Sequence, residues 1–114
     1  MDYKRGDIVL VNFNPQKKKE EIGKTRPAII MSDSELNEVL DLVSVIALTT
    51  NLIEDSEPLR IRISKREKLQ KDSDAMIEQL RNISKSRITE KIASANKDEM
   101  KKIEYGVKLM LGLD

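Results

Sequence analysis

Apolar residues in this chain gather in short runs of five to seven residues, and this grouping restricts the fold more than any other feature. The runs are Ile8–Phe13, Pro27–Met31, Leu42–Leu48, Leu59–Ile63, Ala75–Leu80 and Ile88–Ala93. Most are rich in isoleucine or valine, and each is short enough for a strand and too short for a long helix. The run at Leu59–Ile63 alternates apolar and basic residues, which predicts a strand with one solvent-exposed basic face. We therefore expect six β-strands.

The end of the chain has a helical period instead. Asn96, with Glu99 three residues later, predicts a helix that begins with a capping box. Gly112 is a natural stop for this helix. The apolar residues between them share one face; they are Met100, Ile103, Val107, Met110 and Leu111. A short helix is also predicted between the second and third strands, at Ser34–Leu40. Short strands followed by one amphipathic helix predict a mainly β fold with α, a compact SH3-like barrel.

Length and composition narrow the class of protein. We interpret residues 1–114 as a single domain, small enough that oligomerisation could add buried surface. The chain has no cysteine and no histidine, which excludes disulfides and thiolate chemistry and nearly excludes zinc sites. No apolar run approaches the roughly 20 residues of a membrane span, and the first residues lack the apolar core of a signal peptide. These features predict a cytoplasmic protein.

The charges are segregated although the formal net charge is only +1. Residues 14–26 carry +3, residues 27–57 carry −7 and residues 58–71 carry +5. Such blocks are able to form a local basic groove that attracts a polyanion. The alternative is that the charges only coat solvated loops.

The sequence Lys24-Thr25-Arg26-Pro27-Ala28-Ile29-Ile30 places an arginine directly before an apolar strand and after a basic loop. A guanidinium in this position offers several donors in one plane and keeps its proton, which suits a phosphate group. Arg26 is therefore our first candidate for stabilising negative charge. The alternative is a surface arginine paired with Glu21.

Metal-independent RNA cleavage can use the 2′-hydroxyl of the substrate as nucleophile, and without histidine the protein must rely on arginine, a hydroxyl and a carboxylate. Thr49 ends the third predicted strand and offers the hydroxyl; the alternative is ordinary hydrogen bonding at a strand end. Glu78 lies between apolar residues on a predicted central strand, where burial raises the pKa of a carboxyl group toward a value useful for accepting the 2′-proton. A salt bridge to a neighbouring arginine is the alternative for Glu78.

Other polar residues are candidates for RNA contacts. Gln79 and Arg81 follow Glu78 and suit base or phosphate contacts. Lys19, Lys24, Thr25, Thr50 and Asn51 flank Arg26 and Thr49 in sequence. The aromatic residues Tyr3, Phe13 and Tyr105 are scattered, so recognition should depend on hydrogen bonds and phosphate contacts more than on stacking, and Phe13 is expected in the core.

A metal-dependent nuclease is a competing interpretation. It depends on the acidic residues Asp33, Glu35, Glu38 and Asp41, which are close in sequence. Glu38 and Asp41 fit the solvent-exposed side of a short helix or turn, so we expect no metal and no cofactor.

Several motifs together resemble the MazF/PemK family of toxin endoribonucleases. They are Gly6-Asp7-Ile8-Val9, Phe13-Asn14-Pro15, Glu21-Ile22-Gly23-Lys24-Thr25-Arg26-Pro27-Ala28, Ile46-Ala47-Leu48-Thr49, Glu78-Gln79-Leu80-Arg81 and Leu109-Met110-Leu111-Gly112-Leu113. The resemblance implies a MazF/CcdB-like barrel with catalytic roles for the residues that match Arg26 and Thr49. In some members the acid that matches Glu78 transfers a proton, and a loop glutamate matches Glu21. Two departures are Lys17-Lys18-Lys19, where a Lys-Gly-Ser-like run is common, and Asn12 with Asn14, where acids are common.

The resemblance also implies an activity and partners. The expected reaction is a sequence-selective, metal-independent cut in single-stranded RNA that leaves a 2′,3′-cyclic phosphate and a 5′-hydroxyl. The expected assembly is a homodimer, neutralised by a cognate antitoxin whose acidic, flexible tail occupies the RNA groove.

Two other functions fit a chain of this kind. One is a CcdB-like poison of DNA gyrase, which would use its terminal helix for partner contacts; we expect Met110 and Leu111 to face the core instead. The other is a barrel that binds RNA without cleaving it.

Overall fold

The computed structural model describes residues 2–13 and 25–113. The elements in chain order are β1 (Asp7–Asn12), β2 (Thr25–Ile30), α1 (Ser34–Val39), β3 (Leu42–Thr49), β4 (Arg60–Ile63), β5 (Ser73–Met76), the 3₁₀ turn η2 (Ile77–Gln79), β6 (Arg81–Ser84), the 3₁₀ turn η3 (Lys85–Arg87), β7 (Ile88–Ser94) and α2 (Lys97–Leu111). The predictions for Lys19, Glu21 and Lys24, and for the rest of residues 14–24, concern residues outside those described.

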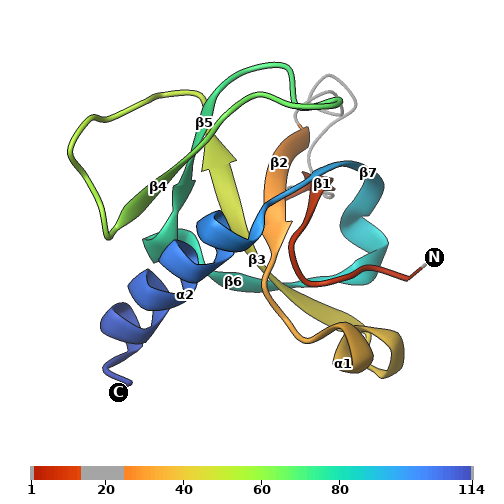
Figure 1. The fold of residues 1–114 in the computed structure, drawn as a ribbon. Helices are drawn as coiled ribbons and strands as arrows, with labels where there is room; N and C mark the ends of the chain where they lie inside the picture. The colour runs from red at the N-terminus through yellow and green to blue at the C-terminus, as the bar shows by residue number, and fades with distance from the viewer. Residues whose placement is uncertain (1, 14–24, 114) are drawn as a thin grey trace.

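The strands form one antiparallel sheet of seven strands in the order β4-β5-β3-β2-β1-β7, with β6 also paired to β3 (Figure 1). The long strand β3 pairs with β2 along one edge, and with β6 and then β5 along the other. The sheet is open between β4 and β7, where the backbone N–H of Lys68 donates to the carbonyl of Ile92 at 3.0 Å. The prediction of a mainly β fold with a C-terminal helix is confirmed, and the barrel has the form of a strongly bent, unclosed sheet.

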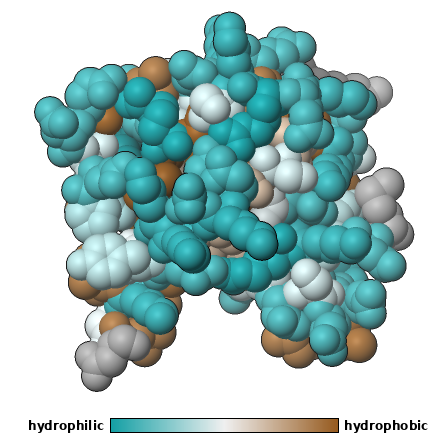
Figure 2. Space-filling model, viewed as in Figure 1, coloured by the Kyte–Doolittle hydropathy of each residue, from teal (hydrophilic) through white to brown (hydrophobic). Residues whose placement is uncertain are grey.

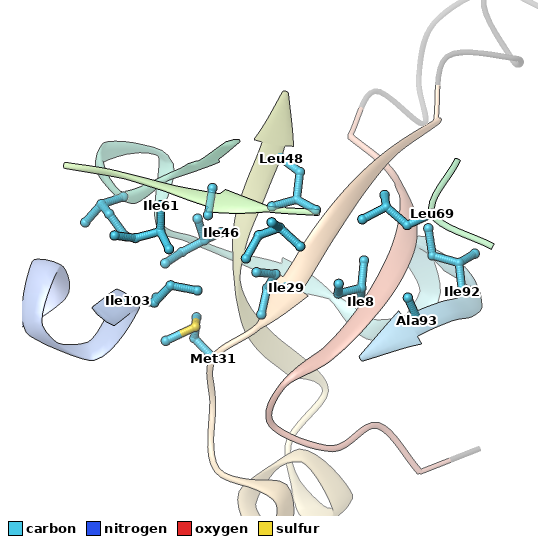
Figure 3. Packing of buried hydrophobic residues seen from close by; sticks show 13 residues of the cluster. Ile8, Ile29, Met31, Ile46, Leu48, Ile61, Leu69, Ile92, Ala93 and Ile103 are labelled. Atoms are coloured by element: carbon cyan, nitrogen blue, oxygen red, sulfur yellow. The ribbon is translucent and has the colours of Figure 1, made fainter. Parts of the chain in front are cut away.

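Alternating side chains on the strands divide the buried residues into two clusters. The larger, which we call the first core, lies under α2 and joins Ile8, Ile29, Ile46, Ile61 and Ile103 (Figure 3). The smaller, the second core, lies on the other side of β1, β2 and β3. Its members are Val9, Val11, Ala28, Ile30, Val43, Val45, Ile83 and Ile88. Side chains of neighbouring residues on one strand therefore pack into different cores, because successive side chains of a strand point to opposite faces of the sheet.

The terminal helix begins as the sequence predicts but differs at its end. The capping box of Asn96 and Glu99 is present, and Gly112 ends the helix with φ 71°. The inner face of α2 packs against the first core only as far as Val107. Beyond it, Met110 and Leu111 are 37% and 53% exposed, so the prediction that they face the core is wrong. Figure 1 shows the reason, because this end of α2 extends past the sheet.

The chain between β5 and β6 also differs from the prediction. We expected one strand over Ala75–Leu80, but the strand ends at Met76 and η2 follows, closed by the N–H of Leu80 donating to the carbonyl of Ile77. The chain then returns to the edge of β3 as β6, which we did not predict. Within the described ranges, no helix combines the length and apolar character needed to cross a membrane.

Candidate functional site

Four polar residues form a line across the sheet at the C-terminal end of β3. Thr49 of β3 is paired with Asp74 of β5, and Asp74 is paired with Arg62 of β4. On the other edge of β3 the recorded ladder reaches Ala28 and Ala47; continued by two residues, its register puts Arg26 of β2 opposite Thr49. Directly opposed residues of antiparallel strands point to the same face. We call Arg26, Thr49, Asp74 and Arg62 the transverse row.

The row lies on the face of the sheet that carries the second core, at the rim of that core. Ala28 and Val45, which belong to the second core, alternate in the same phase as Arg26 and Thr49. Arg26 is exposed and Thr49 half-buried. The pairing of β2 with β3 ends at Ala28 and Ala47, so Arg26 and Thr49 lie beyond the last paired residues. This face of the sheet therefore carries a guanidinium and a hydroxyl, two groups that bind phosphate.

The Thr49 hydroxyl already takes part in a hydrogen bond with the backbone. Its Oγ1 accepts a hydrogen bond from the N–H of Asn51 at 3.1 Å, which leaves the hydroxyl hydrogen available for donation. Thr50 points to the opposite face, where it lines a cavity of about 300 Å³ with Pro27, Lys68 and Lys71. The structure therefore brings Thr49 and Arg26 to one face and places the side chain of Thr50 on the other.

Asp74 is the residue of this region that sequence reasoning missed. Its side chain is 2% exposed, Oδ1 accepts from Arg62 Nε at 2.6 Å, and Oδ2 accepts from the N–H of Ile53 at 2.9 Å. The hydrogen bond from Arg62 to Asp74 raises the pKa of the guanidinium above its ordinary value, so Arg62 stays charged. An acid at the start of the apolar run Ala75-Met76-Ile77 was the available signal.

Glu78 and Gln79 lie on η2, away from the transverse row. Glu78 is 47% exposed on its side chain and lies 3.8 Å from Arg60 Nη2, so the prediction that it is buried on a central strand is wrong. The pairing with a neighbouring arginine, which the sequence left open, is observed. Gln79 is exposed, and η2 packs beside β3. RNA would have to extend along β3 to meet both Thr49 and Glu78.

Arg81 begins β6 and is exposed. Its guanidinium lies 5.0 Å from the centre of the Phe13 ring, a distance typical of a cation–π contact. Phe13 packs against the second core but is only partly buried, so Arg81 covers the rim of that core. Thr25 begins β2 opposite Asn12.

The predicted basic face of β4 is largely neutralised. Arg60 lies near Glu78, and Arg62 bonds both Asp74 and Glu54. Both arginines line an open cleft of about 490 Å³ with the acidic residues Glu54, Asp55, Glu57 and Asp74. One nitrogen of Arg60, Nη1, is buried there without a hydrogen-bond partner. The strand is therefore part of a mixed-charge surface and not a continuous basic groove.

One acidic residue of the metal-nuclease interpretation, Asp33, has a structural role. Asp33 is the N-cap of α1 and accepts from the N–H groups of Glu35 and Leu36. Across the part of the chain that the structure describes, no group of three or more acidic side chains gathers in a way that could hold a metal ion.

Comparison with known proteins decides the family. The family model described as PemK-like, MazF-like toxin of type II toxin–antitoxin systems matches residues 4–111. The chain belongs to this family. Among curated PemK/MazF relatives, Endoribonuclease MazF of Staphylococcus saprophyticus is 32% identical over 111 residues, covering 96% of this chain and 92% of the relative. Endoribonuclease MazF of Staphylococcus epidermidis is 30% identical over 112 residues, covering 97% and 92%.

Solved structures agree on the fold. A MazE–MazF complex from Deinococcus radiodurans matches with a TM-score of 0.79 at 20% identity, covering 100% of this chain and 99% of that chain. MazF from the same organism matches with a TM-score of 0.78 at 23% identity, covering 99% of both chains. The bent open sheet with its C-terminal helix is thus the PemK/MazF fold.

Proposed function

We propose that this protein is an endoribonuclease that cuts single-stranded RNA without a metal ion, as the toxin of a toxin–antitoxin pair. The activity follows from the two Staphylococcus relatives, each an endoribonuclease that matches nearly the whole chain. The observation that supports a site is the phase of β2 and β3: Arg26 and Thr49 alternate with the second-core residues of their strands, so both lie on the same accessible face.

In the proposed reaction, the 2′-oxygen of one ribose attacks the adjacent phosphorus, and the bond to the 5′-oxygen of the next nucleotide breaks. Arg26 stabilises the extra negative charge on the phosphoryl oxygens. Thr49 donates its hydroxyl hydrogen to one of these oxygens, because its lone pair already holds the N–H of Asn51. The 2′-proton passes to an acceptor, for which Glu78 remains the candidate, and the leaving 5′-oxygen takes up a proton. The products are a 2′,3′-cyclic phosphate and a 5′-hydroxyl.

The remaining site residues are proposed as RNA contacts. Gln79 and Arg81 are exposed and lie on the segment that follows β5, and Thr25, Thr50 and Asn51 flank Arg26 and Thr49. Lys19, Glu21 and Lys24 complete this proposed set from residues outside those described. RNA bound by these residues would run along β3 from its C-terminal end toward η2.

The test uses purified protein and a defined single-stranded RNA in the presence of EDTA. We expect cleavage at selected sequences, with 2′,3′-cyclic phosphate and 5′-hydroxyl ends identified by mass spectrometry. Replacing the ribose at one cut position with 2′-deoxyribose should abolish that cut and leave the others. Cleavage at the deoxy position, or cleavage only after a divalent metal is added, would contradict the mechanism.

The protein is further proposed to act in the cytoplasm as a homodimer that a cognate antitoxin with an acidic, flexible tail neutralises. Apolar side chains at the end of α2 support an assembly, because Tyr105, Leu109, Met110, Leu111 and Leu113 are all exposed. We call them the α2-end patch, and Figure 2 shows apolar atoms gathered at this corner of a largely hydrophilic surface. Basic residues that precede Arg26 in the sequence, Lys17, Lys18, Lys19 and Lys24, support an acidic partner.

The α2-end patch also keeps the gyrase-poison alternative testable, since that function requires partner contacts on the terminal helix. A supercoiling assay with DNA gyrase separates the two functions. We expect no inhibition of supercoiling at protein concentrations that cleave RNA completely. Inhibition without RNA cleavage would favour the alternative.

A further inference from the structure

Asp74 is a buried carboxylate within the transverse row. It lies on β5 with a relative exposure of 1%, between Thr49 on one neighbouring strand and Arg62 on the other. We propose that Asp74 is a positioning residue for the cleavage reaction, which fixes the Thr49 hydroxyl through the segment that follows β3. This inference rests on the proposed catalytic role of Thr49.

The segment after β3 is held at two alternate backbone amides. The N–H of Asn51 donates to Thr49 Oγ1 at 3.1 Å, and the N–H of Ile53 donates to Asp74 Oδ2 at 2.9 Å. Since Thr49 and Asp74 are direct partners in the β3–β5 ladder, both bonds hold the segment over the same end of the sheet. The turn after β3 is therefore held by two side chains, that of Thr49, which is the catalytic candidate, and that of Asp74.

Together, these two hydrogen bonds determine the direction in which the hydroxyl hydrogen of Thr49 points. While Thr49 Oγ1 accepts from Asn51, its side chain is held in one rotamer and its hydrogen points away from that amide. Release of Ile53 removes the constraint that keeps Asn51 over Thr49, because Asn51 is exposed. The hydroxyl would then rotate among several donors and acceptors, including water. Binding of RNA by Arg26 and other contacts does not depend on this rotamer.

Arg62 supports this arrangement by binding the other oxygen of Asp74. Its Nε lies 2.6 Å from Asp74 Oδ1, and its Nη2 lies 3.3 Å from Glu54 Oε1. A buried carboxylate is a strong acceptor when a guanidinium balances its charge. Glu54 belongs to the same segment as Ile53, so the ion pairs of Arg62 also tie this segment to the sheet.

The experiment compares kcat and KM for RNA cleavage in three variants. Asp74→Ala removes the acceptor for Ile53, and we expect kcat to fall at least tenfold with KM within about twofold, because loss of alignment without loss of contacts lowers the rate of the chemical step. Asp74→Asn has one acceptor oxygen for two donors, Arg62 Nε and the Ile53 amide, and we expect its kcat to lie between those of the wild type and Asp74→Ala. Asp72→Ala is the matched control, since Asp72 Oδ1 also accepts a backbone N–H, that of Lys65 at 2.8 Å, outside the transverse row.

The inference is overturned if Asp74→Ala keeps kcat within twofold of the Asp72→Ala control, or if Asp74→Asn is no more active than Asp74→Ala. Hydrogen exchange of the wild-type protein provides a second measurement that does not depend on folding of a variant. We expect the amide of Ile53 to exchange at least tenfold more slowly than the neighbouring amide of Leu52, and equal rates would also overturn the inference. Thr49→Ala distinguishes failure of the proposed site from failure of the role of Asp74. Full activity in Thr49→Ala refutes the proposed site. Lost activity in Thr49→Ala, together with unchanged activity in Asp74→Ala, refutes only the role of Asp74.

Discussion

The guanidinium of Arg66 and the carboxylate of Glu99 form a two-pronged ion pair, with Nη1 2.6 Å from Oε1 and Nη2 2.5 Å from Oε2. Arg66 also donates to the carbonyls of Ser64 and Ser94, and Glu99 accepts from the N–H of Asn96. This pair therefore joins the turn after β4, the end of β7 and the first turn of α2. The hydrogen bond to Glu99 raises the pKa of Arg66 above its ordinary value, so the guanidinium keeps its charge.

We expect Arg66→Ala to lower the free energy of unfolding by about 2 kcal/mol, because it leaves a largely buried carboxylate without its partner. Lys68→Ala is the control, since its ion pair with Glu90 at 3.5 Å is exposed on both sides and should contribute less than about 0.5 kcal/mol. Urea denaturation followed by circular dichroism measures both. Equal effects of the two substitutions would contradict the structural role of the Arg66–Glu99 pair.

Arg26→Ala should abolish RNA cleavage with little change in stability. Loss of one preorganised donor to a developing charge typically lowers the rate by about 10²–10³-fold, whereas an exposed side chain contributes less than about 0.5 kcal/mol to folding. Initial rates on a fluorogenic RNA and thermal unfolding supply the two measurements. Lys101→Ala, which removes an exposed cation from α2, should leave both unchanged. Wild-type activity in Arg26→Ala would refute the assignment of this residue.

Glu78→Gln tests the proton acceptor. If Glu78 accepts the 2′-proton, kcat for RNA cleavage should fall by about 10²-fold. Glu90→Gln is the matched control, because Glu90 is a surface carboxylate paired with Lys68. An unchanged kcat in Glu78→Gln would mean that another group accepts the 2′-proton.

Gly106 marks a close approach between α2 and the loop before β4. A Cβ at this position would lie 2.5 Å from the carbonyl oxygen of Pro58 and 3.2 Å from Ile77 Cγ1. We expect Gly106→Ala to destabilise the protein by about 2 kcal/mol, since this clash exceeds the gain in helix propensity of about 1 kcal/mol. Lys101→Ala serves as the control in urea denaturation and should stay within about 0.5 kcal/mol. A more stable Gly106→Ala would show that the loop moves away at no cost.

Leu111→Glu tests the assembly through the α2-end patch. A charge in an apolar contact between copies should shift the protein from dimer to monomer at micromolar concentration, measured by sedimentation velocity. Val39→Glu places the same charge on α1, at a residue that is also exposed, and should leave the dimer intact. Dimers in Leu111→Glu would exclude this patch as the contact.

The sequence predicted those parts of the fold that depend on local pattern. Continuous apolar runs marked the long strand β3 and its neighbours, and the capping box located the start of α2. Strand β6 was missed because Arg81-Asn82-Ile83-Ser84 contains one apolar residue and owes its conformation to pairing with β3. The exposure of the end of α2 was missed because the spacing of apolar residues along a helix does not indicate where the sheet that it packs against ends.

The candidate site was predictable only in part for the same reason. Arg26 and Thr49 end or precede strong strands, so their positions followed from strand boundaries. Burial of Glu78 was inferred from its apolar neighbours Ile77 and Leu80, but these belong to a 3₁₀ turn that leaves the acid at the surface. Asp74 was missed because its partners, Arg62 and the Ile53 amide, lie on segments that only the folded sheet brings together.

The open sheet has a consequence for how copies of this protein can associate. Among the described residues, β4 and β7 pair with no further strand on their outer edges, and edges of this kind can pair with a strand of another molecule. Both carry charged side chains, Arg60 and Arg62 on β4 and Glu90 and Lys91 on β7, and charges of this kind oppose strand addition. High concentration of this toxin should therefore not lead to fibre-like growth through the sheet, and filaments seen by electron microscopy would have to arise from side-chain contacts.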